Sequence, residues 1–294
     1  MKKLLASAFA LMSVVAFAQS NYDTQVQTGN NNATDVEQHG LSNYDRITQT
    51  GNENVADVEQ WGKSNENIIV SLGNRNEVKV LQSGQSNYND IWQQGNDNYG
   101  ETTQHGDDNF AFQTQYGNNN AVYAKQCGEE NRAIQTQVGY GNVADADQAG
   151  IANSADQFQW GVLNLAVANQ LGKDNKANQT QFGSENWAFA YQTGYENEVV
   201  QSQDGYYNTA VATQEGDRNF ISQSQTGDFN LAVDYQNGCD NSIDVTQIGD
   251  GMVHYGTQIG NGNSQVVLQD EQSGGPCLDC PDLPKPKCPS GGDC

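Results

Sequence analysis

Four cysteines near the end of the sequence have a spacing that could support chemistry. They follow the pattern C-x2-C-x7-C-x5-C. Cysteines this close together can bind zinc or form two disulfides. We predict disulfides or intermolecular cross-links, because the start of the chain carries an export signal and disulfides form in oxidising compartments. A zinc site and a tail without fixed structure are the alternatives. The four residues are Cys277, Cys280, Cys288 and Cys294.

Other residues suited to catalysis or metal binding are sparse. His39 and His105 lie far apart in the sequence, and Asp145 and Asp147 are a single pair of carboxylates. Serine, histidine and aspartate are scattered, with no arrangement typical of a catalytic triad. The sequence therefore predicts no catalytic residues, no metal site and no cofactor.

The composition alone is typical of a disordered chain. It includes 36 acidic and 13 basic residues, a net charge of −23, and 35% hydrophobic residues. Low hydrophobicity combined with high net charge leaves little apolar surface to bury. The negative charge also disfavours binding to nucleic acids, because it repels their phosphates. The order of the residues, however, argues against disorder.

The two ends of the chain differ from the rest. Residues 1–18 have a basic start, an apolar stretch and a small-residue cleavage site, which together predict a secretory signal peptide. Residues 19–26 would form a short N-terminal lead. Residues 271–294 contain all five prolines and form a Gly/Pro/Cys-rich tail that cannot continue a strand pattern. We therefore expect a secreted protein with no membrane span in the mature chain.

An 11-residue repeat fills residues 27–270 without insertion or deletion. Its pattern is Q-x-G-x-x-N-x-A-x-x-x, in which Val or Ile often replaces Ala. The Gln series is broken only at Ser71 and the Asn series only at Met252. We predict that the Gln, Gly and Asn positions form structural ladders along the repeat. Representative positions are Gln27, Gly29, Asn32, Gln38, Gly40, Asn43, Gln49, Gly51, Asn54, Gln60, Gly62, Asn65, Gln115, Gly117, Asn120, Gln137, Gly139, Asn142, Gln181, Gly183, Asn186, Gln225, Gly227 and Asn230.

The repeat predicts an all-β fold, a two-sheet β-solenoid. Asn, the residues two and four places after it, and Gln are spaced by two, so a strand directs them to one face. The G-x-x-N segment would form the turn, because these residues tolerate positive φ. The fourth residue after Asn alternates between Gln and Ala over much of the chain, so two units make one coil of 22 residues. The region would hold 22 strand–turn units in 11 coils.

The inward positions have an unusual composition. In residues 27–269 no aromatic residue falls there, and Asp45 and Asp234 are the only charged ones. A core of Gln, Asn, Ala and Val suits two closely packed sheets, with each Gln above another Gln one coil away. The open ends of such a stack leave backbone groups unpaired. We therefore expect copies of the chain to pair end to end as a cross-β filament.

The motif is similar to the curlin repeat of bacterial curli subunits. The segments QTGNENVADVEQ at 49–60 and QLGKDNKANQTQ at 170–181 carry the resemblance, which extends over 27–269. It implies a secreted, cell-surface subunit of functional amyloid fibres that serve biofilm formation and adhesion. It also implies a nucleator subunit and outer-membrane export machinery as partners, besides further copies of the chain. The alternatives are the nucleator itself and a monomeric solenoid that binds glycans or ice.

Overall fold

The structure is a computed structural model that describes residues 20–270. The predicted signal peptide and the four tail cysteines lie outside the described residues. Within residues 20–270, the structure contains no helix that could span a membrane. The division of the chain into signal peptide, lead, solenoid and tail stays a prediction.

The described residues form 23 strands, most of them nine residues long. They are β1 (Tyr22–Asn30), β2 (Ala33–Leu41), β3 (Tyr44–Asn52), β4 (Val55–Lys63), β5 (Glu66–Asn74), β6 (Glu77–Gln85), β7 (Tyr88–Asn96), β8 (Tyr99–Asp107), β9 (Phe110–Asn118), β10 (Ala121–Glu129), β11 (Arg132–Tyr140), β12 (Val143–Ile151), β13 (Ser154–Val162), β14 (Leu165–Lys173), β15 (Lys176–Ser184), β16 (Trp187–Tyr195), β17 (Glu198–Tyr206), β18 (Thr209–Asp217), β19 (Phe220–Thr226), β20 (Leu231–Cys239), β21 (Ser242–Ile248), β22 (Val253–Ile259) and β23 (Ser264–Asp270).

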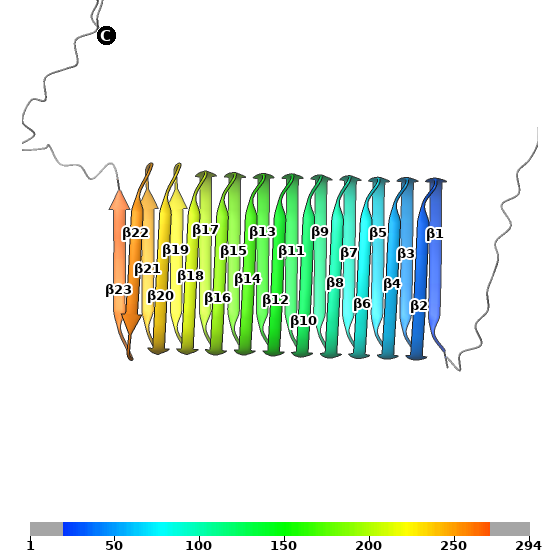
Figure 1. The fold of residues 1–294 in the computed structure, drawn as a ribbon, viewed down its shortest axis with the longest axis horizontal. Coiled ribbons are helices and arrows are strands. Elements are labelled where there is room, and N and C mark those ends of the chain that lie inside the picture. Colours follow the sequence, from blue (N-terminus) through cyan, green and yellow to red (C-terminus); the bar gives the residue numbers. More distant parts are fainter. Residues whose placement is uncertain (1–19, 271–294) are drawn as a thin grey trace, which may run out of the picture.

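The strands build two parallel sheets that face each other. The odd-numbered strands form a 12-stranded sheet and the even-numbered strands an 11-stranded sheet, each in sequence order. Every pairing joins residues 22 positions apart, as in Gln137 beside Gln159. Along the long axis each even strand lies between two successive odd strands, with β1 at one end and β23 at the other (Figure 1). The predicted two-sheet β-solenoid with coils of 22 residues is confirmed.

Strand β1 begins earlier than the sequence analysis expected. Residues 22–26, assigned there to a lead, are part of this strand and pair with 44–48 of β3. The signal was present in the sequence, because Asn21 lies 11 residues before Asn32 and extends the Asn series by one unit. The first repeat Gln, Gln27, therefore lies within a strand rather than at its start.

Each turn contains two residues with positive φ, and only one of them, the repeat Gly, is a residue that the pattern suggested. The repeat Gly has φ between +106° and +138°, and the residue two places later has φ between +53° and +67°. The residue before Asn thus adopts the left-handed conformation, whereas Asn does not. That site accepts Ser42, Glu53 and even Leu163. The pattern missed it because almost any residue type occupies it.

The repeat Gly is required by close approach of the backbone. A Cβ atom at Gly139 would lie 1.9 Å from the carbonyl oxygen of Gly161 in the next coil. The same clash recurs along both edges of the stack, with distances of 1.7 to 2.2 Å from Gly29 to Gly238. The glycines at these positions therefore set how closely one coil can stack on the next.

The core changes composition part-way along the stack. The first cluster contains Ile, Val and Ala from β3 to β7, and the second, from β9 onwards, contains mostly Ala. At the boundary, one column changes from Ile91 to Gln113. The Oε1 atom of Gln113 is buried without a hydrogen bond in the described part of the chain, since Ile91 has no donor to offer.

Candidate functional site

The repeat glutamines form two columns of amide groups inside the solenoid, one in each sheet. In the middle of one column, Gln137 donates from Nε2 to Gln159 Oε1 at 2.8 Å and accepts from Gln115 Nε2 at 3.1 Å. Gln137 Nε2 also lies 2.9 Å from the carbonyl oxygen of Ala121 in the opposite sheet. Both amide protons and the oxygen of Gln137 are used. The columns therefore tie each coil to the next one and each sheet to the other.

A buried amide without its partners is costly, so Gln137→Leu should destabilise the protein by about 2–4 kcal/mol. The leucine fills a similar volume but leaves Gln159 Oε1 without its donor.

Ser71 provides the matched reverse test, because here the column is interrupted and Ser71 reaches Gln93 only through its hydroxyl. Ser71→Gln should raise the free energy of unfolding by about 1 kcal/mol. Urea unfolding of freshly prepared monomer measures both; equal stability of wild type and Gln137→Leu would contradict the role of the column.

The repeat asparagines form a second set of columns at the turns. Asn142 donates from Nδ2 to Asn120 Oδ1 at 3.1 Å and to the carbonyl oxygen of Gly161 at 3.0 Å. Its backbone N–H also donates to Asn120 Oδ1. Each Asn thus binds the previous coil through its neighbour and the following coil through the repeat Gly. The predicted Gln, Gly and Asn positions lie in these columns, and their role in assembly stays a proposal.

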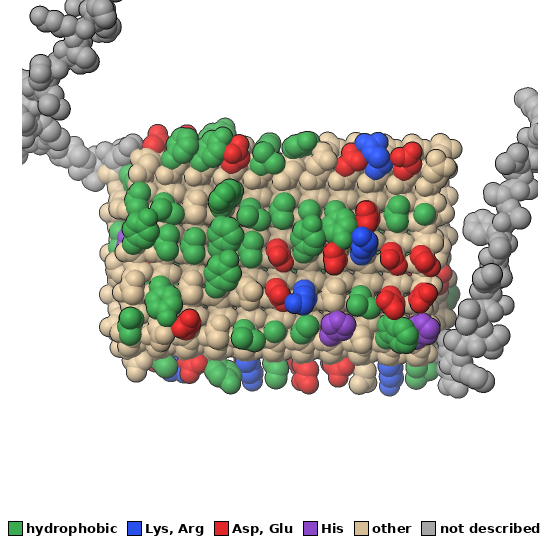
Figure 2. Space-filling model, viewed as in Figure 1, with side chains coloured by type: hydrophobic (Ala, Val, Ile, Leu, Met, Phe, Trp, Pro, Cys, Tyr) green, Lys and Arg blue, Asp and Glu red, His purple; other side chains and the backbone are tan. Residues whose placement is uncertain are grey.

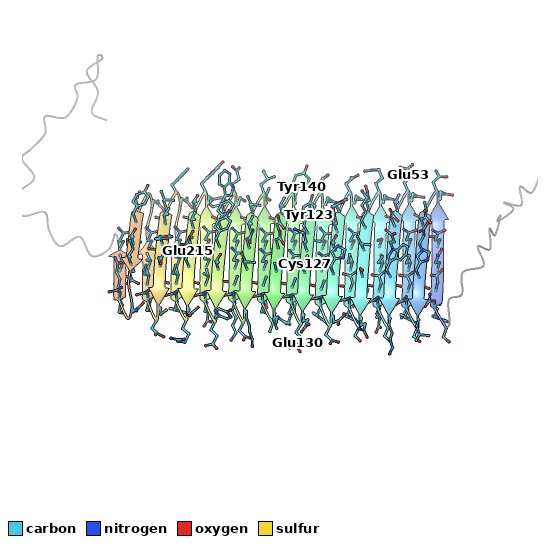
Figure 3. All side chains as sticks on the ribbon, turned by 60° about the horizontal axis from the view of Figure 1, so that its bottom comes forward. Glu53, Tyr123, Cys127, Glu130, Tyr140 and Glu215 are labelled. Atoms are coloured by element: carbon cyan, nitrogen blue, oxygen red, sulfur yellow. The ribbon has the colours of Figure 1, made fainter. Side chains whose placement is uncertain are left out.

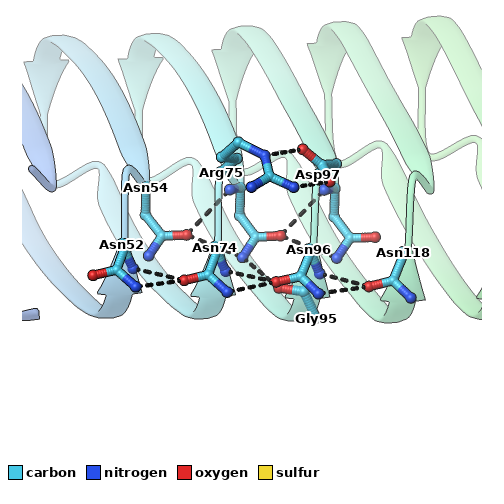
Figure 4. Close-up of polar contacts among 10 residues, drawn as sticks. Asn52, Asn54, Asn74, Arg75, Gly95, Asn96, Asp97 and Asn118 are labelled. Carbon is cyan, nitrogen blue, oxygen red and sulfur yellow. Dashed lines mark hydrogen bonds and ion pairs between the residues drawn. The ribbon is translucent and has the colours of Figure 1, made fainter. Parts of the chain in front are cut away.

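One further amide column escaped the sequence analysis. Asn52, Asn74, Asn96 and Asn118 follow the repeat Gly in successive coils and are joined by Nδ2–Oδ1 hydrogen bonds of 2.8 to 3.0 Å (Figure 4). Beside them Arg75 pairs with Asp97 through two hydrogen bonds of 2.6 and 2.7 Å. The signal that could have found the column is the recurrence of Asn every 22 residues rather than every 11.

Asp45 is a buried carboxylic acid at the start of a short polar column. It accepts from Asn67 Nδ2 at 2.6 Å, and Asn67 accepts from Asn89 Nδ2 at 2.7 Å. Its other oxygen has no hydrogen bond in the described residues. Burial raises the pKa of Asp45 to about 7, which the hydrogen bond from Asn67 only partly offsets. Asp45 therefore titrates near neutral pH.

The raised pKa of Asp45 predicts how stability depends on pH. The folded state binds this proton more tightly than the unfolded chain, in which the pKa is about 4. The free energy of unfolding should therefore rise as the pH falls from above about 7 towards 4. Above pH 7 the buried Asp45 carboxylate is charged, and this charge destabilises the folded state. Asp45→Asn should raise the melting temperature at pH 8 and flatten this dependence. Asp57→Asn, on the outer face of β4, is the control; an identical pH profile for both variants would contradict the assignment.

The second buried carboxylate lies near the other end of the stack. Asp234 lies 3.0 Å from Nε2 of His254 and accepts from Gln223 Nε2 at 2.7 Å. Burial raises the pKa of Asp234, although both neighbours act against the rise. His254 is 8% exposed and faces inward from β22, the last even strand. The sequence analysis placed Asp234 at an inward position but did not predict its contact with His254.

The histidines and the aspartate pair that the sequence analysis considered for chemistry lie on the outside of the described solenoid and are not brought together. His39 stacks on Trp61 with ring centroids 4.0 Å apart, and Asp147 pairs with Lys125. Cys127 and Cys239 are free thiols; Cys127 is seen on the outer surface with Tyr123 and Glu215 (Figure 3). Among residues 20–270, no group of three or more His, Cys, Asp or Glu side chains could hold a metal ion.

The two ends of the stack are open sheet edges. Within residues 20–270, strands β1 and β2 at one end, and β22 and β23 at the other, each have a single neighbouring strand. As a result Gln27 in β1 is exposed, although Gln49, its equivalent in β3, is completely buried. The side faces differ from the edges: they carry scattered hydrophobic side chains, with acidic groups concentrated toward the β1 end in the view shown (Figure 2).

Comparison with known families agrees with the period and the columns. The family model of the curlin associated repeat matches residues 29–62, 95–128 and 216–249. The chain is a curlin-repeat protein. Each matched segment begins at a repeat glycine, Gly29, Gly95 or Gly216, so all three keep the same 11-residue register as the unmatched units between them. No curated protein matches the chain.

Proposed function

We propose that this curlin-repeat protein is a secreted structural subunit, without enzymatic activity, that assembles end to end into curli-type amyloid fibres at the bacterial cell surface. The observation that carries the proposal is the pair of open edges at the ends of a stack whose side chains already repeat in register. An edge strand of this kind offers a row of unpaired backbone groups to another chain. Another copy of the solenoid presents the complementary row.

The amide columns support the same proposal. At the N-terminal edge, Gln27 and Gln38 donate inward to Gln49 and Gln60. In the described part of the chain their own Oε1 atoms accept no hydrogen bond from a preceding coil, because none precedes them. At the other edge Gln269 accepts from Gln247, and among residues 20–270 no glutamine of a following coil is there to receive its donor. Donors and acceptors at the two ends are therefore complementary.

The experiment is a time course of the purified mature chain by electron microscopy and sedimentation. We expect unbranched filaments and a meridional X-ray reflection near about 4.8 Å. A chain that stays monomeric at high concentration for days would contradict the proposal. The same preparation, added in trace amounts to a companion curlin subunit, distinguishes a bulk subunit from a nucleator, because only a nucleator shortens the companion's lag phase at low ratio.

We further propose biofilm matrix formation and adhesion as the role of these fibres, with a nucleator subunit and outer-membrane export machinery as partners. The support is the family match alone. Deleting the gene and examining the cell surface tests this directly: we expect loss of fibres and of attachment. Fibres that persist unchanged in the deletion strain would contradict it.

A further inference from the structure

The number of strands in the described chain is odd, and this constrains how one copy can follow another. The odd sheet begins with β1 and ends with β23, whereas the even sheet begins with β2 and ends with β22. Successive strands alternate between the sheets along the axis (Figure 1). The next strand in the path after β23 would therefore lie on β22, in the even sheet. A following copy that continues the stack must therefore pair its β1 with β22 in the even sheet and its β2 with β23 in the odd sheet.

A following copy in the same orientation as the first would leave a gap. Its β1 would pair with β23, but its β2 would then lie two strand spacings from β22, about 9.6 Å instead of about 4.8 Å. Two edges would stay unpaired inside the fibre. Exchanging the sheets by rotating the copy half a turn about the fibre axis pairs all four edge strands.

The inward side chains also fit the exchanged arrangement. When the 22-residue register is continued, His254 in β22 meets Asp23 in β1 of the next copy, and Val267 in β23 meets Val36 in β2. The first is a pair of opposite charge when the histidine is protonated, at a site where His254 already lies beside Asp234. The second joins the two apolar clusters, since Val267 packs on one and Val36 on the other.

A turn residue fits as well. Asn261 follows the repeat Gly after β22 and accepts from the backbone N–H of Cys239. In the exchanged arrangement it lies beside Asn30 of the next copy, which begins the exposed Asn column. Without the exchange, Val267 would meet Gln25, whereas His254 and Asn261 would face Thr34 and Leu41 only across the gap above β22. Strand number and side-chain fit are independent, and both favour the exchange.

We propose that successive copies in the fibre are related by about half a turn about the fibre axis, so that β1 of each copy pairs with β22 of its neighbour and β2 pairs with β23. This inference rests on the proposed fibre function. Each copy adds 23 strands, or about 55 Å of length. The 12-stranded sheet of one copy continues into the 11-stranded sheet of the next.

Cysteine pairs on the outer face test the rotation. Parallel neighbours in a sheet are close enough for a disulfide. All six native cysteines are first replaced by serine, and the variant is checked for fibre formation. The pairs Thr24→Cys with Tyr255→Cys, and Asp35→Cys with Val266→Cys, are neighbours only if the sheets exchange. The matched control pair, Thr24→Cys with Val266→Cys, is adjacent only if the sheets do not exchange. The pair Asp35→Cys with Tyr255→Cys is adjacent in neither arrangement and gives the background level.

The expected result is a ladder of covalent multimers on mild oxidation of fibres with the first two pairs, at least tenfold above the other two pairs. Stronger cross-linking of the pair Thr24→Cys with Val266→Cys, or equal cross-linking of all four pairs, would overturn the half-turn proposal while leaving end-to-end assembly intact. Fibres in which no pair cross-links would overturn it too. If neither the cysteine-free chain nor the wild type forms fibres, the result would instead contradict the proposed function.

Discussion

Gly139→Ala is expected to disrupt the solenoid around β11 and β13. The added Cβ would lie 1.9 Å from the carbonyl oxygen of Gly161, which belongs to the rigid backbone of the next coil. The φ of +131° is also unfavourable for alanine. The coils must separate to relieve the overlap, which breaks the backbone and amide hydrogen bonds on both sides. We expect a loss of more than about 4 kcal/mol in the free energy of unfolding.

The matched control for Gly139→Ala is Gly251→Ser. Gly251 also has positive φ, +67°, but a Cβ there would meet no atom within 4 Å. Serine already occupies the equivalent turn position at Ser42, Ser64 and Ser86. This variant should unfold within about 1 kcal/mol of wild type. Circular dichroism in urea and limited proteolysis make the comparison; equal stability of the two variants would show that coil stacking does not depend on the repeat glycine.

Gly260→Ala is expected to stop fibre growth at the end that carries β22 and β23. Within one chain, a Cβ at Gly260 would meet only Asn263 Nδ2, at 3.7 Å. In a fibre it would meet the carbonyl oxygen of a repeat glycine of the next copy, as Gly238 would meet Gly260 at 2.0 Å. The φ of +109° adds strain of about 1–3 kcal/mol in a terminal turn. The solenoid should therefore stay folded but fail to accept a successor.

Elongation from preformed seeds measures this effect. The variant alone should elongate at least tenfold more slowly than wild type, and small amounts of it should block wild-type growth, because an added variant chain ends the fibre. Gly262→Ala is the control, since Gly262 has φ +67° and no atom within 4 Å of its Cβ position. Growth of the Gly260→Ala chain at the wild-type rate would show that this turn is not covered by another copy.

Much of this fold could be predicted from the sequence, because period and side-chain direction are linked in a strand. An uninterrupted 11-residue spacing places Gln49, Ile47 and Asp45 on one face, and all three are buried. The alternation of Gln and Ala at alternate units showed that a coil takes two units. Neither step needed knowledge of distant contacts, since every contact repeats the one before it.

Other features depend on three-dimensional surroundings that a pattern does not carry. The left-handed residue before Asn is set by backbone geometry and tolerates many side chains, so no residue type marks it. The raised pKa of Asp45 arises from burial by a neighbouring coil, and the contact between His254 and Asp234 joins residues of two adjacent strands of one sheet. The change from Ile91 to Gln113 at the fourth residue after Asn was visible in the sequence, but the unpaired Oε1 atom of Gln113 was found only in the structure.

The central claim is that the solenoid continues from one copy into the next through its open edges. Cryo-electron microscopy of fibres grown from the mature chain tests it most directly. We predict a single column of two facing sheets, with strands perpendicular to the axis and a spacing of about 4.8 Å that persists across the boundary between copies. Fibres in which copies are joined through their side faces, or in which β22 and β23 remain unpaired, would contradict the account.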